Sequence, residues 1–480
     1  MPAKNAFAYA IRMHRSKLPI STEYTRRQPE NTVLYKVVQN NYQKYFAQKS
    51  AIGVEYPKFI HDTFKKYLTC GILENGFVRC HCKTYRHDFL IGFSCKCRGF
   101  CNSCHGRRQA ESAVHLDKIF PNFQYRQWVL SLPYETRYTV ANNPELLSKI
   151  LNVYIRAIRS WYRRKARLMG YKNTVTGSVC FIHRFNSALT LSPHFHTLFL
   201  DGVYYKKDDA YFFLSVGSPK PSDLEKIVER IYNKVHKILL KLEPVENIII
   251  DSRNPIQNGV GHIKVLEHYI PIPKSEYVEA KDPYSAKLKG FSLNAKVVIP
   301  KDKRDKLKKL IRYVARGPIA QSRLKELPNG VSYELKNEWS NGATHTIFNN
   351  DSFIQRLIAL IPPARSNQTR YFGIFAPNFK DREKIIPPKK EGSTTQNKSN
   401  RVLWADLMKL SFGFNVTVCK KCSGRMTPIA VIKDKKIAHK ILEHMKLLTK
   451  FPIKKTGTDP PQFDEPPAFN EMSDQRPTEW

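Results

Sequence analysis

Seven of the ten cysteines lie between Cys70 and Cys104, a density that packing alone does not explain. A structural zinc ion takes four nitrogen or sulfur ligands, and the C-x-x-C spacing from Cys101 to Cys104 turns two thiolates toward one point. A pairing with Cys80 and Cys82 would close such a site, and two sites sharing the seven thiolates would also fit. The expected zinc ligands are Cys70, Cys80, Cys82, Cys95, Cys101 and Cys104, with Cys97, His81, His87 and His105 nearby.

A second C-x-x-C lies near the other end of the chain, from Cys419 to Cys422. It has the form of one half of a zinc site, a knuckle, but no second pair lies close to it in the sequence. A second zinc site and unmetallated thiols are therefore both open at this position.

A different kind of metal site is indicated by His194 and His196, which flank a phenylalanine at the start of an apolar stretch. In a strand, residues two apart project from the same face, so both imidazoles could bind one ion. His183 ends the preceding apolar stretch and is the third candidate, with Asp201 as its rival. Three protein ligands on a divalent ion leave positions open for a phosphate oxygen. Two surface histidines are the plainer reading of the pair alone.

A basic helix carries the candidate nucleophile. Between residues 304 and 316, a buried stripe is predicted from Leu307, Leu310, Ile311 and Val314. Tyr313 falls on the other side, together with Lys306, Lys309 and Arg316. A tyrosine at a helix boundary is the alternative reading of this pattern.

The elements that must position these side chains follow from periodicity. Strands are predicted at 124–132, 177–185 and 194–200, and helices at 32–46, 144–165, 222–242 and 304–316. We expect Asn31 or Thr32 to cap the first helix, and a Ser222-x-x-Glu225 capping box to begin the third.

Composition points to a polyanionic partner. The chain has 480 residues, with 80 Lys and Arg against 41 Asp and Glu, and a net charge of +39. Nucleic acid is the first candidate and an anionic membrane surface the second. No apolar run reaches the roughly 18 residues of a membrane span, and the N-terminus has no apolar signal region. Clustered cysteines then favour metal in a reducing compartment over disulfides.

Six regions are expected along the chain. They are a basic arm with helices at 1–66, a zinc-binding module at 67–120, a catalytic core at 121–380, a linker at 381–400, a basic C-x-x-C module at 401–455 and a disordered acidic, proline-rich tail at 456–480.

Taken together, these blocks resemble rolling-circle transposases of the IS91 and common-region (ISCR) type, within the HUH endonuclease superfamily. The resemblance runs from about Thr32 to Leu442. It is carried by TVLYKVVQ, SCKCRGFCNSCHGRR, QWVLSLP, RFNSALTLSPHFHTLFLDGVY, GFSLNAKVVIP, RYVARGPIAQSRL, LIPPARSNQTRYFGIFAPN and CKKCSGRM. It implies an α+β fold: an HUH-type antiparallel sheet flanked by helices, with an N-terminal zinc module and a small C-terminal C-x-x-C module.

The resemblance also implies roles for individual residues. His194 and His196 become the metal-binding pair, His183 a third ligand where relatives commonly carry Gln, and Tyr313 the nucleophile. Gly317 stands where the two-tyrosine branch has its second tyrosine, so the chain resembles the single-tyrosine branch. Other departures are Asn294, Asn367 and Phe372, where relatives often have His. The residues expected to contact DNA are Lys309, Arg312, Arg316, Arg323, Arg365 and Arg370.

The implied reaction nicks and rejoins single-stranded DNA at element termini and target through a 5′-phosphotyrosine. The implied cofactors are Mg²⁺ or Mn²⁺ at the histidine site and structural Zn²⁺ at the cysteines. No nucleotide is expected, since the chain lacks a phosphate-binding G-x-x-x-x-G-K-[ST] loop. The protein is expected to be cytoplasmic, nucleoid-associated and of prokaryotic type. The alternatives are a plasmid replication initiator or relaxase of the same superfamily, and a DNA-binding protein whose catalytic site has decayed. A carboxylate-triad nuclease is disfavoured by the low acid count.

Overall fold

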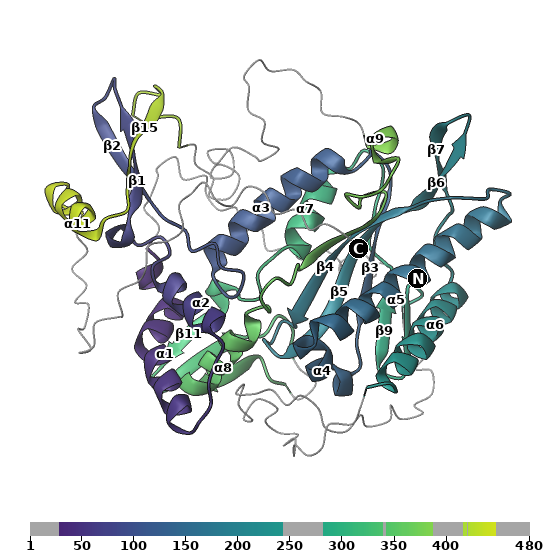
Figure 1. Ribbon diagram of the computed structural model, residues 1–480, viewed down its shortest axis with the longest axis horizontal. Helices are drawn as coiled ribbons and strands as arrows, with labels where there is room; N and C mark the ends of the chain where they lie inside the picture. Colours follow the sequence, from purple (N-terminus) through teal and green to yellow (C-terminus); the bar gives the residue numbers. More distant parts are fainter. Residues whose placement is uncertain (1–27, 243–281, 339–341, 387–415, 420, 448–480) are drawn as a thin grey trace, which may run out of the picture.

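The computed structural model of the protein describes residues 28–242, 282–338, 342–386, 416–419 and 421–447 (Figure 1). Residues 1–27 of the predicted arm region, 387–400 of the predicted linker, 401–415 of the predicted C-terminal module and the predicted acidic tail lie outside these ranges. Within them, no helix is long and apolar enough to cross a membrane.

A seven-stranded sheet forms the centre of the molecule, and all of its pairings are antiparallel. Its order is β14-β4-β5-β3-β9-β8, and β10 also pairs with β3. The strands are β3 Tyr125–Ser131, β4 Gly177–Phe185, β5 Leu191–Leu200, β8 Ser285–Leu288, β9 Phe291–Asn294, β10 Val298–Ile299 and β14 Thr369–Gly373. The three strands predicted from periodicity are therefore present, and β5 begins three residues earlier than expected.

Helices cover both faces of this sheet (Figure 1). One face packs on α5 (Pro144–Leu168) and α6 (Pro221–Leu239), and receives Phe195 and Phe199 of β5. The opposite face packs on α3 (Asn102–Ile119) and α7 (Arg304–Val314). The alternating residues Leu198 and Leu200 point to this second face, as the two-residue period of a strand requires.

Local sequence explains how the helices begin, with one correction. The Thr32 hydroxyl accepts the Tyr35 N–H and caps α1 (Val33–Ala51), as expected. The predicted Ser222-x-x-Glu225 box is wrong. Pro221 occupies the first turn, where its fixed φ suits a helix, so α6 begins earlier, and the Asp223 carboxylate accepts the Lys220 N–H at 3.0 Å.

A second apolar core joins two N-terminal helices and one later helix to a small sheet. The helices are α1, α2 (Lys58–Leu68) and α8 (Asn350–Leu360); the strands are β11 Leu324–Leu327, β12 Gly330–Glu334 and β13 His345–Asn349. The remaining elements are η1 Pro29–Asn31, η2 Leu73–Asn75, η3 Tyr134–Thr136, α4 Arg137–Asn142, β6 Gly202–Lys207, β7 Ala210–Ser215, η4 Gln321–Arg323 and α9 Arg382–Ile385.

The C-terminal segment joins the N-terminal part of the chain. Strand β15 (Met426–Ile432) pairs with β1 (Phe77–Cys82), which in turn pairs with β2 (His87–Gly92). Helix α11 (Lys435–His444) packs beside them, and together these elements form the left-hand lobe of Figure 1. One strand of the predicted C-terminal module, β15, is thus the third strand of a sheet with β1 and β2.

Candidate metal and nucleophile site

Three histidines gather on the α3 and α7 face of the central sheet. His183 of β4 lies directly opposite His194 of β5, and His196 is two residues further along the same strand. Their ring centroids are 4.6 to 5.1 Å apart. The structure therefore brings together the three histidines that the sequence singled out, with one ligand atom of each within 4.8 Å of the others.

Hydrogen bonds fix how each imidazole is oriented. His183 Nε2 lies 2.6 Å from the carbonyl oxygen of Val314, and His194 Nδ1 lies 2.7 Å from that of Ser192. A carbonyl only accepts, so these nitrogens donate, and His183 Nδ1 and His194 Nε2 keep their lone pairs. His196 Nδ1 pairs with the side-chain amide of Gln127 at 2.7 Å. Partners of this kind orient the imidazole ligands of metal ions.

The three imidazoles are held neutral. Burial lowers the pKa of each, in the case of His183 to about 3. Neighbouring histidines lower the pKa of His183 and His196 further, and Arg316 lowers the pKa of all three. Neutral imidazole is the form that binds a metal ion. With the free lone pairs of His183 Nδ1 and His194 Nε2 beside the His196 ring, the cluster fits a divalent cation that retains open coordination positions.

Tyr313 lies in the last turn of α7, next to the residue that contacts His183. The stripe of Leu307, Ile311 and Val314 is buried against the sheet, which leaves the Tyr313 side chain 37% exposed. The Arg316 guanidinium lies 4.4 Å from the Tyr313 ring centroid. The charge of Arg316 also lowers the pKa of all three imidazoles.

Gly317 follows α7 and is packed against the N-terminal zinc-binding region. A Cβ atom added there would lie 2.7 Å from Cγ of His105 on α3. His105 is itself held by the carbonyl oxygen of Gly99, 2.7 Å from its Nε2. A larger side chain at position 317 therefore has no room in this arrangement.

Asp201, the rival third ligand in the sequence analysis, is used elsewhere. Its carboxylate accepts hydrogen bonds from Nε and Nη2 of Arg126, at 3.1 and 3.0 Å. Both side chains are 1% exposed. Tyr162 and Gln124 donate to the same carboxylate at 2.9 and 2.7 Å. Its partners are thus a buried cation and two neutral donors, and the expectation that Asp201 competes for the ion is wrong.

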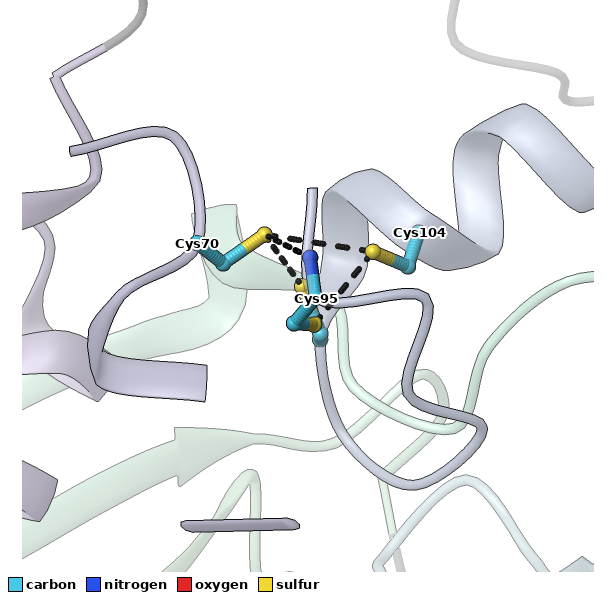
Figure 2. Close-up of side chains that lie close together, drawn as sticks. Cys70, Cys95 and Cys104 are labelled. Carbon is cyan, nitrogen blue, oxygen red and sulfur yellow. Dashed lines mark hydrogen bonds between the residues drawn. The ribbon is translucent and has the colours of Figure 1, made fainter. Parts of the chain in front are cut away.

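A compact group of four thiols lies at the start of α3 (Figure 2). Cys70, Cys95, Cys101 and Cys104 have their sulfur atoms within 4.8 Å of one another. Three of the sulfur–sulfur separations are 3.4, 3.6 and 3.9 Å. A zinc ion with bonds of about 2.3 Å places tetrahedral sulfur ligands about 3.8 Å apart, so the group fits zinc. Figure 2 shows the Cys70, Cys95 and Cys104 thiols directed toward a common centre.

The expected pairing of Cys80 and Cys82 with this group is wrong. Both lie on β1, and Cys82 instead forms a cluster with Cys419 and Cys422, within 4.8 Å. The cause is the pairing of β15 with β1, which places Met426 opposite Cys82.

The other side chains near the cysteines have partners of their own or stand apart. The Cys97 sulfur lies 3.5 Å from the Cys95 carbonyl oxygen, and His81 Nδ1 lies 2.5 Å from Asp88 Oδ1. His87 is exposed.

The residues expected to contact DNA fall into three groups. Lys309 and Arg312 are exposed on α7, and Arg316 is exposed two residues after its end. Arg365 and Arg370 line one hollow beside β14. Arg323 differs, since its guanidinium donates to the backbone carbonyls of Glu334 and Ser187 at 2.5 and 3.1 Å.

Sequence reasoning missed Gln127 and the Val314 carbonyl. Gln127 lies on β3, next to β5 in the sheet, and nothing in its local pattern distinguishes it from any polar strand residue. The Val314 contact is a backbone interaction across 131 positions, which no residue type could signal.

Two family models match the chain. Residues 177–383, which contain the three histidines and Tyr313, match the family described as "Putative transposase". Residues 37–132, which contain Cys70 to Cys104, match "Transposase zinc-binding domain". Cys419 and Cys422 lie outside both ranges. No curated protein and no solved structure gave a significant match.

Proposed function

The chain belongs to the IS91-type transposase family, and we propose that it nicks and rejoins single-stranded DNA at element ends through a 5′-phosphotyrosine on Tyr313. Repeated transfer of this kind drives rolling-circle transposition. In this proposal the central antiparallel sheet is of the HUH type, and the enzyme belongs to the single-tyrosine branch.

One observation carries the proposal. The hydrogen bond from His183 Nε2 to the Val314 carbonyl, at 2.6 Å, joins the histidine cluster to the turn that bears Tyr313. The Tyr313 side chain is 37% exposed on this basic turn, as a nucleophile that must reach DNA requires. Arg316, which lies over the ring and near the cluster, supports the same reading.

The histidine site supports binding of Mg²⁺ or Mn²⁺ through His183, His194 and His196. When bound, such an ion polarises the scissile phosphate and stabilises negative charge on the oxygens around phosphorus. The chain's own contribution is orientation: backbone carbonyls hold His183 and His194, and Gln127 holds His196.

In the proposed step, the Tyr313 oxygen attacks phosphorus, and the bond from phosphorus to the 3′ oxygen breaks. The phenol proton passes through solvent to the departing oxygen, which leaves as a 3′-hydroxyl. The phosphate stays on Tyr313, and a second DNA hydroxyl later reverses the exchange. The bond energy is conserved in the ester, so no nucleotide is consumed. Arg316, with the Lys336 amine 5.8 Å from the ring centroid, supplies positive charge beside the attacking group.

The basic exposed side of α7 would hold the DNA strand beside the nucleophile. Lys309 and Arg312 precede Tyr313 on this surface, and Arg365 and Arg370 line a hollow at the edge strand β14. Arg323 is less suited to this role, because backbone carbonyls already take up its donors. The first cysteine cluster would hold structural zinc.

The test is a covalent-adduct assay with full-length protein, Mn²⁺ and single-stranded oligonucleotides from an element end. We expect the adduct on the 5′ side of the cut, with the label mapped to Tyr313. Tyr313→Phe should abolish the adduct and retain DNA binding. Tyr205→Phe, a half-buried tyrosine on β6, is the control and should react normally. An undiminished adduct in Tyr313→Phe would remove this residue from the mechanism.

The metal assignment is tested separately. A double variant, His194→Ala with His196→Ala, should bind DNA and fail to cleave it. Full cleavage by this variant would exclude the histidine cluster from catalysis, whatever the role of Tyr313.

A further inference from the structure

Three cysteines from opposite ends of the chain meet outside the first zinc cluster. Cys82 lies on β1, and Cys419 and Cys422 lie just before β15. The sulfur atoms of Cys82 and Cys422 are 3.4 Å apart, although 340 positions separate them. This spacing is close to the roughly 3.8 Å expected between thiolates on one zinc ion.

The turn that carries Cys419 and Cys422 is built to direct its thiols to one side. The Cys419 N–H donates to the Gly424 carbonyl at 2.7 Å, and Ser423 has a φ of 56°. A Cβ atom at Gly424 would lie only 3.2 Å from the Cys422 sulfur, so a side chain there would crowd the thiol. The left-handed backbone at Ser423 and the missing side chain at Gly424 therefore leave space for an ion beside the Cys422 sulfur.

A fourth thiol, outside the 4.8 Å group, is buried in the same apolar cluster. Cys80 precedes Cys82 by two residues on β1, so the two side chains leave the strand on the same face. Cys80 is 1% exposed and belongs to the same apolar cluster as Cys82 and Cys419. His87 lies opposite Cys82 across the hairpin, but it is exposed.

We propose that Cys80, Cys82, Cys419 and Cys422 form a second structural zinc site, which fastens the C-terminal segment to the N-terminal hairpin. Zinc with four thiolates carries a net charge of about −2, which requires nearby cations. Lys83, Arg86, Lys421 and Arg425 surround the cluster in sequence, and the Lys421 amine lies 4.8 Å from the ring centroid of Tyr85 on the opposing hairpin. The four thiols lose their protons to solvent when the ion binds.

The fold gives this site a mechanical role. Helix α11 contributes two buried residues, Ala438 and Leu442, to a small core shared with Leu73, Phe77 and Leu90. Partly buried residues, Ile432, Ile441 and Met445, pack against it. Much of β15 is solvent-exposed, including Ile429 and Val431. A zinc ion ligated from both segments would hold the third strand in register where apolar contacts are few.

Zinc content of the purified full-length protein is the first test. We expect about two ions per chain, one for each cysteine cluster, after dialysis under reducing conditions. Cys419→Ser with Cys422→Ser should lower this to about one ion, with the first cluster still loaded as evidence that the protein is folded. Cys97→Ser is the matched control and should keep both ions. One ion in the unaltered protein, or two in the double variant, would overturn the proposal.

The fourth ligand is tested by a pair of single substitutions. Cys80→Ser should release the second ion to a chelator far more readily, and His87→Asn should behave like the unaltered protein. In the cobalt-substituted protein, thiolate-to-cobalt absorption should weaken with Cys80→Ser alone. The opposite result, with His87 required and Cys80 dispensable, would overturn the four-thiolate assignment.

A disulfide between Cys82 and Cys422 is the competing chemistry. Alkylation of thiols in denatured protein, with and without a reductant, separates the two cases. Four free thiols that are protected until a chelator is added support zinc. A disulfide-linked peptide pair with a single zinc ion per chain refutes it.

Discussion

The sharpest stability prediction concerns Asp201, because the structure and the sequence assign it different roles. In the structure its carboxylate neutralises Arg126 at the end of the central sheet, with both side chains 1% exposed. It also accepts hydrogen bonds from Tyr162 and Gln124. Asp201→Ala would leave a buried guanidinium with only the Ser218 hydroxyl and the Ala295 carbonyl as partners.

The expected loss follows from that geometry. Removing one partner of a buried ion pair costs about 3 to 5 kcal/mol, because the remaining charge stays desolvated and uncompensated. Domains are commonly stable by about 5 to 15 kcal/mol, so the variant should fold in the cold and unfold at much lower urea concentration. Tryptophan fluorescence is a suitable probe, since Trp128 Nε1 donates to the Tyr162 hydroxyl at 3.2 Å and so lies in the same network.

His183→Ala is the matched comparison. It should abolish or strongly weaken Mn²⁺ binding with a smaller change in the free energy of unfolding, and Asp201→Ala should show the reverse. Titration calorimetry with Mn²⁺ on both folded variants separates them. If Asp201→Ala remains as stable as the unaltered protein, or loses Mn²⁺ affinity while fully folded, the assignment of Asp201 to a structural ion pair fails.

Other expectations follow from the same contacts. Burial lowers the pKa of His183 to about 3 and those of its two partners in the same direction. The unfolded chain therefore takes up protons below about pH 6.5 that the folded state does not, and the free energy of unfolding should fall as the pH drops below that value. Mn²⁺ affinity, measured by calorimetry, should change less than about tenfold from pH 7.5 to 5.5, whereas three ordinary histidines would lose up to about a thousandfold. Gly317→Ala should lower the free energy of unfolding, measured by urea denaturation, by about 1 to 3 kcal/mol, because the added Cβ would clash with His105. An unchanged free energy of unfolding would show that α3 can shift away from this position without cost. Arg312→Ala should lower the salt dependence of single-strand binding by about 0.7 in the logarithmic slope, and Arg230→Ala on α6, across the sheet, should leave it unchanged; equal effects would refute a DNA path along α7.

The part of the site that sequence could predict depends on local periodicity. Two histidines separated by one residue share a face in any strand, and the position of His183 at the end of the preceding strand made its return beside them natural. The stripe of Leu307, Ile311 and Val314 likewise fixed which side of α7 is exposed, and hence that Tyr313 points outward. Such patterns repeat within a few residues, so the sequence contains them directly.

The failures have the opposite character. Asp201 is paired with Arg126 across 75 positions, and Cys82 with Cys422 across 340. Neither partner is marked by its own neighbours: Arg126 lies in an apolar strand, and the C-x-x-C turn has no second pair beside it. Spacing rules apply to ligands that lie within one short segment. The Asp201 and Cys82 contacts instead depend on which strands pair in the fold, and local spacing does not contain that information. The α6 cap failed for a smaller reason, because Pro221 starts the helix earlier than the serine pattern suggests.

The zinc cluster and the tyrosine helix are linked by a single rigid element. Cys101 is the N-cap residue of α3 and Cys104 lies in its first turn, so the first cluster fixes the N-terminal end of this helix. At its other end, Asp117 binds Arg304 and Lys308 of α7, at 2.7 and 3.1 Å, and the two helices lie side by side in Figure 1. Ion pairs at partly exposed positions contribute little energy alone, but they act together with the apolar core that α3 and α7 share. A change in the four thiols therefore has a direct route, through one helix, to the element that presents the nucleophile. The same route reaches the histidine cluster, because His183 Nε2 donates to the carbonyl of Val314 at the end of α7, so a movement of α7 would shift the tyrosine and this imidazole together.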